Sequence, residues 1–391
     1  MIHRKKISEV LIENDLDIIV ASSPQNVFYL SGLESLTQRL LGQKAFAIWQ
    51  KDLSNPILVL PAVDASIIVD TNVPYNSVYT YGNFFLYEGT ELSPSDRAVQ
   101  NIKNENNFEN PILALLSAIN SLPLTSGTIA IEKSGFSFSE IDELTHGLTF
   151  NIVAAENLLS ELRQIKNKNE VKRLKKAVEI NQNAIEKAIT IVELGMTEQA
   201  LAKCYESELI SQGAYPLFTA IGFGSHGAYP HAVPGARTLE RGDLIRFDVG
   251  CTYANYSSDI ARTFSFGEPE PTLQKKYEVL NGSMDRGIDL LCDGVSTDVI
   301  FNSVVDYVNE YGSKLFPKFN RNHVGHGIGI DVYDRPTISP GMGILKSGMI
   351  LCIEPPYYEL GTAGIQVEDE VHITPKGVKR LSHCDPTLLV L

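Results

Sequence analysis

The pattern of the chain changes near residue 157, and this change limits the fold more than any other feature of the sequence. Before it, short apolar runs alternate with segments of helical character. One helix start is marked by Ser23 as N-cap and Pro24 in the first turn, and another by the acidic first turn of FSFSEIDELTHGL (136–148). Strands are predicted in LDIIVASS (16–23), KAFAIWQ (44–50), PILVLPA (56–62) and GTIAIEKSG (127–135). This alternation is typical of an α/β domain with helices packed on a sheet.

After residue 157 the pattern becomes helical and then strand-rich. The segment LLSELRQIKNKNEVKRLKKAVEINQNAIEKAITIVELG (158–195) predicts one broken helix or two successive amphipathic helices. A further helix is expected after Thr197, its N-cap, and it should end at Gly213. Strand patterns dominate the remainder, apart from a helical block at 271–312. We therefore expect a second domain of mixed α and β structure.

A length of 391 residues suits two domains. Since the pattern changes near residue 157, we expect an N-terminal domain over 1–158 and a C-terminal domain over 159–391. Within the first domain, NIKNENNFEN (101–110) is polar and rich in Asn, and it predicts a surface loop.

Composition excludes several classes of partner and location. The net charge is −14, which does not suit nucleic acid or an anionic membrane as a partner. No apolar run reaches the roughly 18 residues of a transmembrane helix, and the opening MIHRKKISEVLIEND lacks the apolar core of a signal peptide. The five cysteines are widely spaced and never form a CxxC pair, as expected for reduced thiols. We therefore expect a cytoplasmic protein whose partner is neither nucleic acid nor a membrane.

Two segments have the form of antiparallel hairpins with acidic residues on both arms. In LIRFDVGCTYANYSSDIARTFSF (244–266), Asp248 would face Asp259 if the turn centres between Tyr253 and Ala254. Directly opposed residues point to the same face of a sheet, so both carboxylates would share one site.

The second hairpin is predicted in MILCIEPPYYELGTAGIQVEDEVHIT (349–374). Glu354 would pair with Glu368 about a turn centred on Gly361. Pro355 and Pro356 indicate that the first arm ends early or lies at a sheet edge.

Four carboxylates with apolar neighbours must be protonated or neutralised by a cation if they are buried together. A pair of divalent ions bridged by carboxylates does this well. His326, set among glycines in HVGHGIGIDVYDRP (323–336), adds an imidazole, and an oxygen-rich set with one imidazole suits Mn²⁺ better than Co²⁺ or Zn²⁺. Each acidic residue taken alone is better explained as a surface residue of a strand, and the histidine as a buried polar side chain. The order and spacing of all five favour a metal site.

At this point the C-terminal half resembles the pita-bread metalloenzymes, which include prolidase, aminopeptidase P, methionine aminopeptidase and the metal-free creatinase. The matching stretches are YPHAVPG, RGDLIRFDVG, NYSSDIARTF, GHGIG, LKSGMILCIEPPYY and VEDEVHITPKG, in the family's order over roughly 165–380. The linker RQIKNKNEVKRLKKA and the N-terminal SPQNVFYLSGL resemble the two-domain members. The resemblance implies a creatinase-like α/β N-terminal domain followed by a pita-bread catalytic domain.

The resemblance also implies roles for particular residues. The metal ligands would be Asp248, Asp259, His326, Glu354 and Glu368. Of these, Asp259 and Glu368 would bridge two ions, and the glycines around His326 would let the backbone pass close to the metals. His231 would bind substrate and stabilise the oxyanion, and Glu354 would also transfer a proton. Two-domain members are dimers, so a homodimer is expected.

Three departures from the family pattern concern substrate choice. Tyr333 and Asp334 stand where many peptidase members carry His and Glu, Gln366 stands where prolidase-like members carry Arg, and Pro355-Pro356 replaces Pro-Gly. We therefore expect Tyr333 and Gln366 to contact substrate. The first interpretation is an Xaa-Pro dipeptidase or aminopeptidase. The departures favour an alternative, a metal-dependent hydrolase of a small non-peptide amide or amidine, of creatinase-like or ectoine-hydrolase-like type. A third is a non-catalytic binding protein on the same fold.

Overall fold

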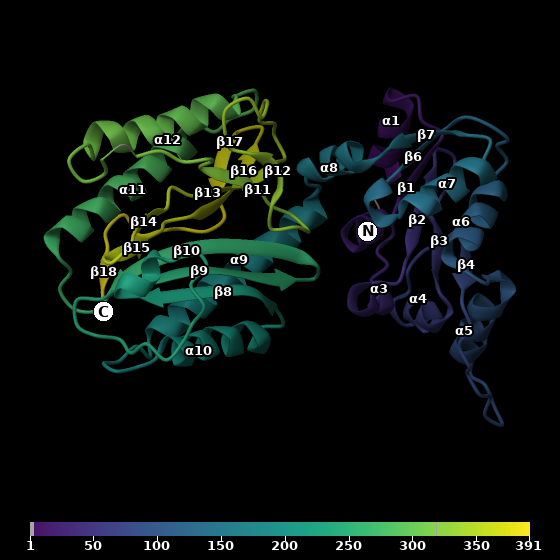
Figure 1. Ribbon diagram of the computed structural model, residues 1–391, viewed down its shortest axis with the longest axis horizontal. Helices are drawn as coiled ribbons and strands as arrows, with labels where there is room; N and C mark the ends of the chain where they lie inside the picture. Colours follow the sequence, from purple (N-terminus) through teal and green to yellow (C-terminus); the bar gives the residue numbers. More distant parts are fainter. Residues whose placement is uncertain (1–3, 318) are drawn as a thin grey trace. The chain divides into compact units, whose positions relative to one another are not determined.

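The computed structural model describes residues 4–317 and 319–391. The chain divides into two compact units, Met1–Leu162 and Arg163–Leu391 (Figure 1). No helix within the described residues is long and apolar enough to cross a membrane.

The first unit is built around a seven-stranded sheet with the order β5-β4-β3-β2-β1-β6-β7. The central strand β2 runs antiparallel to both of its neighbours, and the other strand pairs are parallel. The strands are β1 (Ile18–Ala21), β2 (Phe46–Gln50), β3 (Ile57–Pro61), β4 (Ser77–Tyr81), β5 (Asn107–Phe108), β6 (Thr128–Ile131) and β7 (Asn151–Ala154). The helices are α1 (Arg4–Glu13), α2 (Pro24–Ser31), α3 (Leu36–Leu41), α4 (Ala65–Thr71), α5 (Pro94–Glu105), α6 (Pro111–Asn120) and α7 (Phe138–Gly147).

Most predicted elements of this unit are confirmed, and one is wrong. The side chain of Ser23 accepts a hydrogen bond from the Asn26 amide and caps α2. The expected loop at 101–110 is instead the last turn of α5 followed by β5. A capping box between Ser93 and Asp96 starts α5, and burial of Ile102 extends it through the Asn-rich segment.

Two successive helices follow, as the pattern after residue 157 allows. They are α8 (Glu156–Gln164) and α9 (Lys168–Ile189), and the side chain of Asn167 caps the second. Helix α10 (Glu198–Ser211) begins after Thr197, whose side chain accepts from the Ala200 amide, as predicted.

The second unit contains a four-stranded sheet, order β18-β10-β9-β8, and a five-stranded sheet, order β12-β11-β13-β16-β17. A two-stranded ribbon joins β14 to β15. The strands are β8 (Tyr215–Phe223), β9 (Leu244–Tyr253), β10 (Tyr256–Ser265), β11 (Gly325–Gly327), β12 (Asp334–Thr337), β13 (Ile350–Ile353), β14 (Tyr357–Glu359), β15 (Ala363–Ile365), β16 (Asp369–Thr374), β17 (Gly377–Arg380) and β18 (Leu389–Val390).

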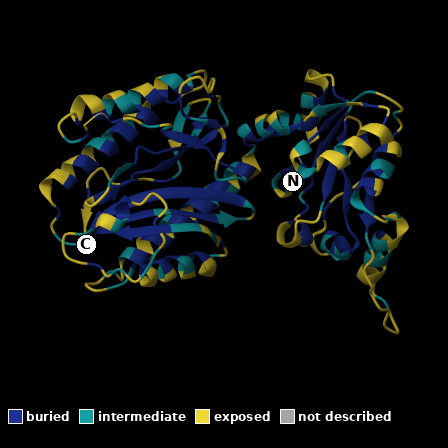
Figure 2. Ribbon diagram, in the orientation of Figure 1, coloured by how far each residue is buried: buried dark blue, intermediate teal, exposed yellow. Residues whose placement is uncertain are grey.

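Helices cover the outer faces of these two sheets (Figure 1). The pair α9 and α10 packs on β8, β9 and β10, and its core includes Tyr205 and Phe247. The pair α11 (Pro271–Asp289) and α12 (Thr297–Tyr311) packs with the five-stranded sheet around Leu280 and Leu351. The strands of both sheets are largely buried (Figure 2). Polar side chains on the inner faces therefore lie between two apolar cores.

Candidate metal centre

The β9–β10 hairpin carries the first two acidic candidates, but in a register that differs from the prediction. Asp248 pairs with Ala261, and Asp259 pairs with Gly250. The turn is formed by Ala254 and Asn255, both with positive φ (49° and 65°), as a tight two-residue hairpin turn requires. The expected direct pairing of the two aspartates is therefore wrong by two residues. A shift of two residues keeps every side chain on its face, so both carboxylates still point to the same side.

The second hairpin has the predicted register. Ile353 pairs with Asp369 and Tyr357 pairs with Ile365, which sets Glu354 and Glu368 opposite each other just beyond the ends of β13 and β16. Strand β13 ends at Ile353, immediately before Glu354 and the two prolines, as expected. The prolines thus separate the sheet from the β14–β15 ribbon and leave both glutamates at the break.

His326 lies on β11, the strand between β12 and β13, opposite Cys352. Its neighbouring glycines allow close approach of strands. A Cβ on Gly325 would lie 2.1 Å from the Cys352 carbonyl oxygen, and one on Gly327 would lie 2.4 Å from the Arg335 carbonyl oxygen. The glycines thus allow close approach to the two adjacent strands, and the expected approach of the backbone to the metals stays a prediction. The glycines hold His326 in place through this packing.

Gly327→Ala is expected to destabilise the protein by about 1–3 kcal/mol, the usual cost of overpacking, because the added methyl meets backbone that cannot rotate away. The melting temperature measures this effect. Gly89→Ala is the control, since no atom lies within 4 Å of the position that its Cβ would take. Equal melting temperatures for the two variants would contradict the packing role of Gly327.

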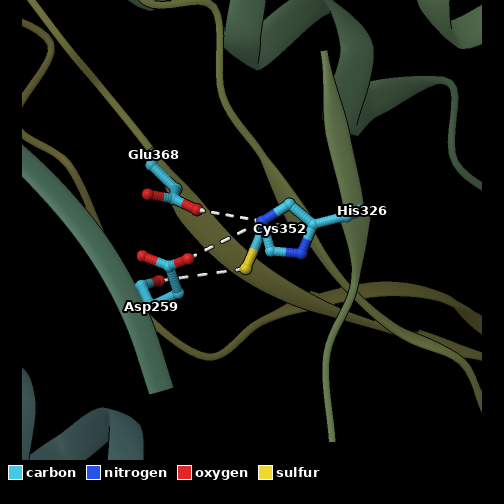
Figure 3. Close-up of side chains that lie close together, drawn as sticks. All are labelled: Asp259, His326, Cys352 and Glu368. Carbon is cyan, nitrogen blue, oxygen red and sulfur yellow. Dashed lines mark hydrogen bonds and ion pairs between the residues drawn. The ribbon is translucent and has the colours of Figure 1, made fainter. Parts of the chain in front are cut away.

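Four side chains converge on one point between the sheets (Figure 3). His326 Nε2 lies 3.6 Å from Asp259 Oδ2, 3.6 Å from Glu354 Oε1 and 3.9 Å from Glu368 Oε1. Potential ligand atoms of Asp259, His326, Cys352 and Glu368 all lie within 4.8 Å of one another. Asp248, on the wall of the adjoining cavity, completes the set predicted from the sequence. The structure thus brings all five predicted ligands together.

Several buried atoms of this cluster have no hydrogen-bond partner among the described residues. His326 Nε2, Asp259 Oδ1, Glu354 Oε1 and both carboxylate oxygens of Glu368 are buried without a hydrogen bond. Such atoms are costly unless a ligand satisfies them. The Nδ1 atom of His326 donates to the Gly327 carbonyl at 3.0 Å, which leaves Nε2 as the lone-pair atom that faces the carboxylates. The donor set therefore fits divalent cations.

Electrostatics lead to the same conclusion. Burial, together with the neighbouring carboxylates, raises the pKa values of Asp259 and Glu368 well above their usual range. Burial and the nearby Asp248 raise the pKa of Glu354 to about 8, and burial also raises the pKa of Asp248. Burial lowers the pKa of His326 to about 4, so its imidazole is neutral at pH 7. Positive charge must enter the cluster before all four carboxylates can ionise together.

Cys352 belongs to the cluster but was not predicted. Its thiol donates to the main-chain carbonyl oxygen of Asp259, with Sγ and O 3.9 Å apart, and burial raises the pKa of the thiol. Strand alternation contains part of the signal, since Cys352 on β13 and Glu354 just beyond its end are two residues apart. We regard the thiol as a neutral donor that links β13 to the Asp259 backbone on β10.

A cavity of about 680 Å³ adjoins the cluster and is large enough for a small peptide. His231, Tyr333 and Gln366, all predicted to face substrate, line it. The Tyr333 ring stacks on the His326 imidazole, with centroids 3.8 Å apart and an interplanar angle of 22°. Gln366 accepts a hydrogen bond from the hydroxyl of Tyr358 at 3.1 Å. Tyr333 therefore faces the cavity.

Two cavity residues were missed by the sequence analysis. His323 Nδ1 lies 3.7 Å from Glu354 Oε1, and the guanidinium of Arg321 lies over the Tyr358 ring at 5.9 Å. The only sequence feature that could have indicated these two residues is that they lie close to His326 in the same glycine-containing segment. Nothing in the sequence shows that a residue three or five positions before a ligand points into the same cavity.

The raised carboxylate pKa values predict how pH affects the metal-free protein. The pKa values of Glu354 and Glu370 are each raised to about 8 by burial, so between pH 7 and 8 the folded state holds protons that the unfolded state has lost. The free energy of unfolding should therefore fall as pH rises, by up to about 1.4 kcal/mol per pH unit for each group. Bound metal must displace the proton of the proposed ligand Glu354, so metal affinity should rise over the same interval.

Melting of chelator-treated protein at pH 7 and pH 8, and Mn²⁺ titration at both, measure the two effects. Burial lowers the pKa of His326, so this residue makes the protein more stable as pH rises, but only up to about pH 6.5, where the imidazole of the unfolded chain has lost its proton. Between pH 7 and pH 8 it therefore does not oppose the effect of the carboxylates. A metal-free protein that is more stable at pH 8 than at pH 7 would refute the carboxylate account.

Both units of the chain are similar to known proteins, in sequence and in structure. Residues 172–375 match the sequence model of metallopeptidase family M24, and residues 3–165 match the Creatinase/Prolidase N-terminal domain. A prolidase from Pyrococcus furiosus has a similar structure, with a TM-score of 0.76 at 26% sequence identity over 97% of this chain and 99% of that one. For a dipeptidase from Pyrococcus horikoshii the TM-score is 0.80 at 26% identity over 99% of each chain.

Two further comparisons cover nearly the whole chain. An uncharacterised peptidase from Staphylococcus aureus is 26% identical over 384 residues, which is 97% of this chain and 98% of that protein. The X-Pro aminopeptidase from Thermotoga maritima is similar in fold, with a TM-score of 0.80 at 22% identity over 100% of each chain. The predicted fold class, an α/β N-terminal domain followed by a pita-bread catalytic domain, is confirmed.

Proposed function

We propose, since the chain belongs to metallopeptidase family M24, that it is a dinuclear-metal-dependent hydrolase that cleaves Xaa-Pro peptide bonds, as a dipeptidase or an aminopeptidase. One observation carries the proposal: unpartnered buried atoms of His326, Asp259, Glu354 and Glu368 converge beside a cavity of peptide size. The structural similarity to a prolidase supports the choice of substrate. The presence of all five candidate ligands argues against a non-catalytic binding protein.

In this proposal the five side chains Asp248, Asp259, His326, Glu354 and Glu368 hold two divalent ions. Mn²⁺ suits the oxygen-rich set best, with Co²⁺ or Zn²⁺ as substitutes. Such ions lower the pKa of water towards neutrality and polarise the scissile carbonyl.

In this proposal His231 binds the substrate and Glu354 transfers a proton. His231, on the cavity wall near Asp248, donates a hydrogen bond to the carbonyl oxygen as negative charge develops there. Glu354 accepts a proton and passes it to the leaving nitrogen of proline. Tyr333 and Gln366 shape the part of the cavity that selects substrate.

A second candidate function follows from Tyr333. Its ring covers one face of the His326 imidazole and narrows the cavity next to the cluster. A smaller substrate, such as a non-peptide amide or amidine, needs less of that space than a peptide does. The same ligands and the same proton transfers serve this reaction.

Assembly and location are part of the proposal. We place the enzyme in the cytoplasm as a homodimer that acts on small peptides. Sedimentation of the purified protein at micromolar concentration tests the assembly, and a monomer would contradict it.

A substrate panel tests the function. Gly-Pro, Ala-Pro, longer Xaa-Pro peptides, matched Xaa-Ala peptides and small amides are incubated with protein to which Mn²⁺ has been added. Preferential release of product from Xaa-Pro substrates, abolished by chelator and restored by Mn²⁺, is expected. Turnover confined to the non-peptide amides would establish the second candidate instead.

A further inference from the structure

Arg246 is a fully buried arginine on β9, two residues before Asp248. Residues two apart on a strand share a face, so its side chain extends towards the same site. A buried guanidinium is costly unless it is hydrogen-bonded; here Nη1 and Nη2 have partners, whereas Nε has none among the described residues. The partners of this group therefore indicate why the chain keeps a charge there.

One nitrogen of the guanidinium serves the metal cluster. Nη1 donates to Gln366 Oε1 at 2.7 Å and to Asp248 Oδ2 at 3.3 Å. Gln366 in turn donates to Glu354 Oε2 at 3.4 Å. Arg246 is thus connected to two of the proposed ligands, one directly and one through the amide of Gln366.

The other nitrogen holds a backbone turn. Nη2 donates to the carbonyl oxygen of Tyr229 at 2.6 Å and to that of Pro230 at 3.0 Å. The Tyr229 carbonyl also accepts from the Ala232 amide at 3.0 Å, which closes a four-residue turn over 229–232. His231 is the third residue of this turn and is exposed, so the backbone of the turn determines where its imidazole lies.

A planar guanidinium fixes the distance and angle between its two nitrogens, which an ammonium group does not do. In Arg246 those nitrogens join Asp248 to the turn that carries His231. Arg262 is a second buried arginine on the adjacent strand, but its hydrogen bonds go to Asp369 and to the carbonyls of Ala261 and Glu368, and none goes to Asp248 or to the 229–232 turn. The two-sided connection is therefore particular to Arg246.

We propose that Arg246 is a positioning residue that couples the metal ligand Asp248 to the His231 turn, with the neutral amide of Gln366 as its acceptor. The part of this inference that concerns His231 rests on the proposed function. The positive charge beside Asp248 comes from β9, and the neutral amide at position 366 accepts from it.

Arg246→Lys tests the coupling without removing the charge. A single ammonium cannot hold Gln366, Asp248 and both carbonyls together. We expect a folded protein in which hydrogen exchange of the Ala232 amide is at least about tenfold faster, since the turn opens more often. We also expect metal affinity to fall by about 10–100-fold, the usual effect of losing an orienting partner of a ligand. If the proposed function holds, kcat falls more than KM rises.

The control is Arg237→Lys. Arg237 donates to the Phe223 carbonyl and to Asp243 in the same unit, but it contacts neither the turn nor Asp248. The Arg237→Lys variant should therefore have the same hydrogen exchange at the Ala232 amide and the same metal affinity as the wild type. Equal exchange and equal metal affinity in wild type and Arg246→Lys would overturn the proposal, whatever the substrate proves to be.

A relocation variant separates charge from geometry. Arg246→Met/Gln366→Arg returns a cation beside Asp248 from the other side of the site. We expect this double variant to recover the metal affinity of the wild type, while hydrogen exchange of its Ala232 amide stays faster than in the wild type. Recovery of both would show that charge alone suffices, and the coupling role would be wrong. Because exchange and metal affinity are measured without substrate, a failure of the Xaa-Pro assignment leaves this test intact.

Discussion

Asp259→Ala and Glu368→Ala are each expected to remove both metal ions and to lower kcat/KM by at least about 10³-fold, a loss of roughly 4 kcal/mol of transition-state stabilisation. Both oxygens of Glu368 are buried without a partner, so each is available to a different ion. Asp259 offers one unpartnered oxygen and a second that lies 3.6 Å from His326. A carboxylate shared by two ions cannot be lost without weakening both.

Metal content after purification without chelator, together with the rate on the best substrate, measures this result. Glu370→Gln is the matched control, because Glu370 is a buried carboxylate two residues beyond Glu368 that accepts from the Asp259 amide at 2.9 Å. It should keep two ions, with affinity lowered by no more than the roughly 10–100-fold of an indirect contact. Full metal content in either alanine variant would show that the bridging assignment is wrong.

Tyr333→His is expected to raise the turnover of prolyl dipeptides by about 10²-fold, the lower end of what one general acid–base group contributes. Burial and the surrounding carboxylates raise the pKa of the Tyr333 phenol far above its usual range, so it donates a hydrogen bond but does not titrate near pH 7. A histidine titrates there and is smaller, so it supplies a proton and opens the cavity beside His326.

Metal content should not change in this variant, since Tyr333 stacks on the imidazole without being one of the five proposed ligands. Tyr333→Phe is the control: it keeps the ring and removes the hydroxyl, so it should leave turnover low. If Tyr333→His changes the rate on neither prolyl nor non-prolyl substrates, Tyr333 only packs against His326.

The sequence predicts the second hairpin better than the first for a local reason. Gly361 and the two prolines after Glu354 mark both the turn and the end of the strand, and the observed register follows from them. No comparable signal marks Ala254 and Asn255, whose positive φ angles set the first turn. The predicted pairing of Asp248 with Asp259 was wrong for that reason, although both side chains remained on one face because the error was two residues.

Contacts between distant strands account for the residues that the sequence did not predict. Arg246 meets Gln366 across 120 positions of the chain. Cys352 joins the cluster because β13 lies beside β11 and β16; alternation along the strand relates Cys352 to Glu354 but does not predict these neighbours. Local signals such as caps, prolines and alternation predicted which residues share an element, and the packing of two sheets determined which of them share the site.

Anomalous diffraction from crystals grown with Mn²⁺ tests the central claim most directly. The account predicts two anomalous peaks roughly 3.5–4 Å apart, both in contact with Asp259 and Glu368, with His326 beside one of them. A single peak, or two peaks of which either lacks contact with Asp259 or Glu368, would contradict the account.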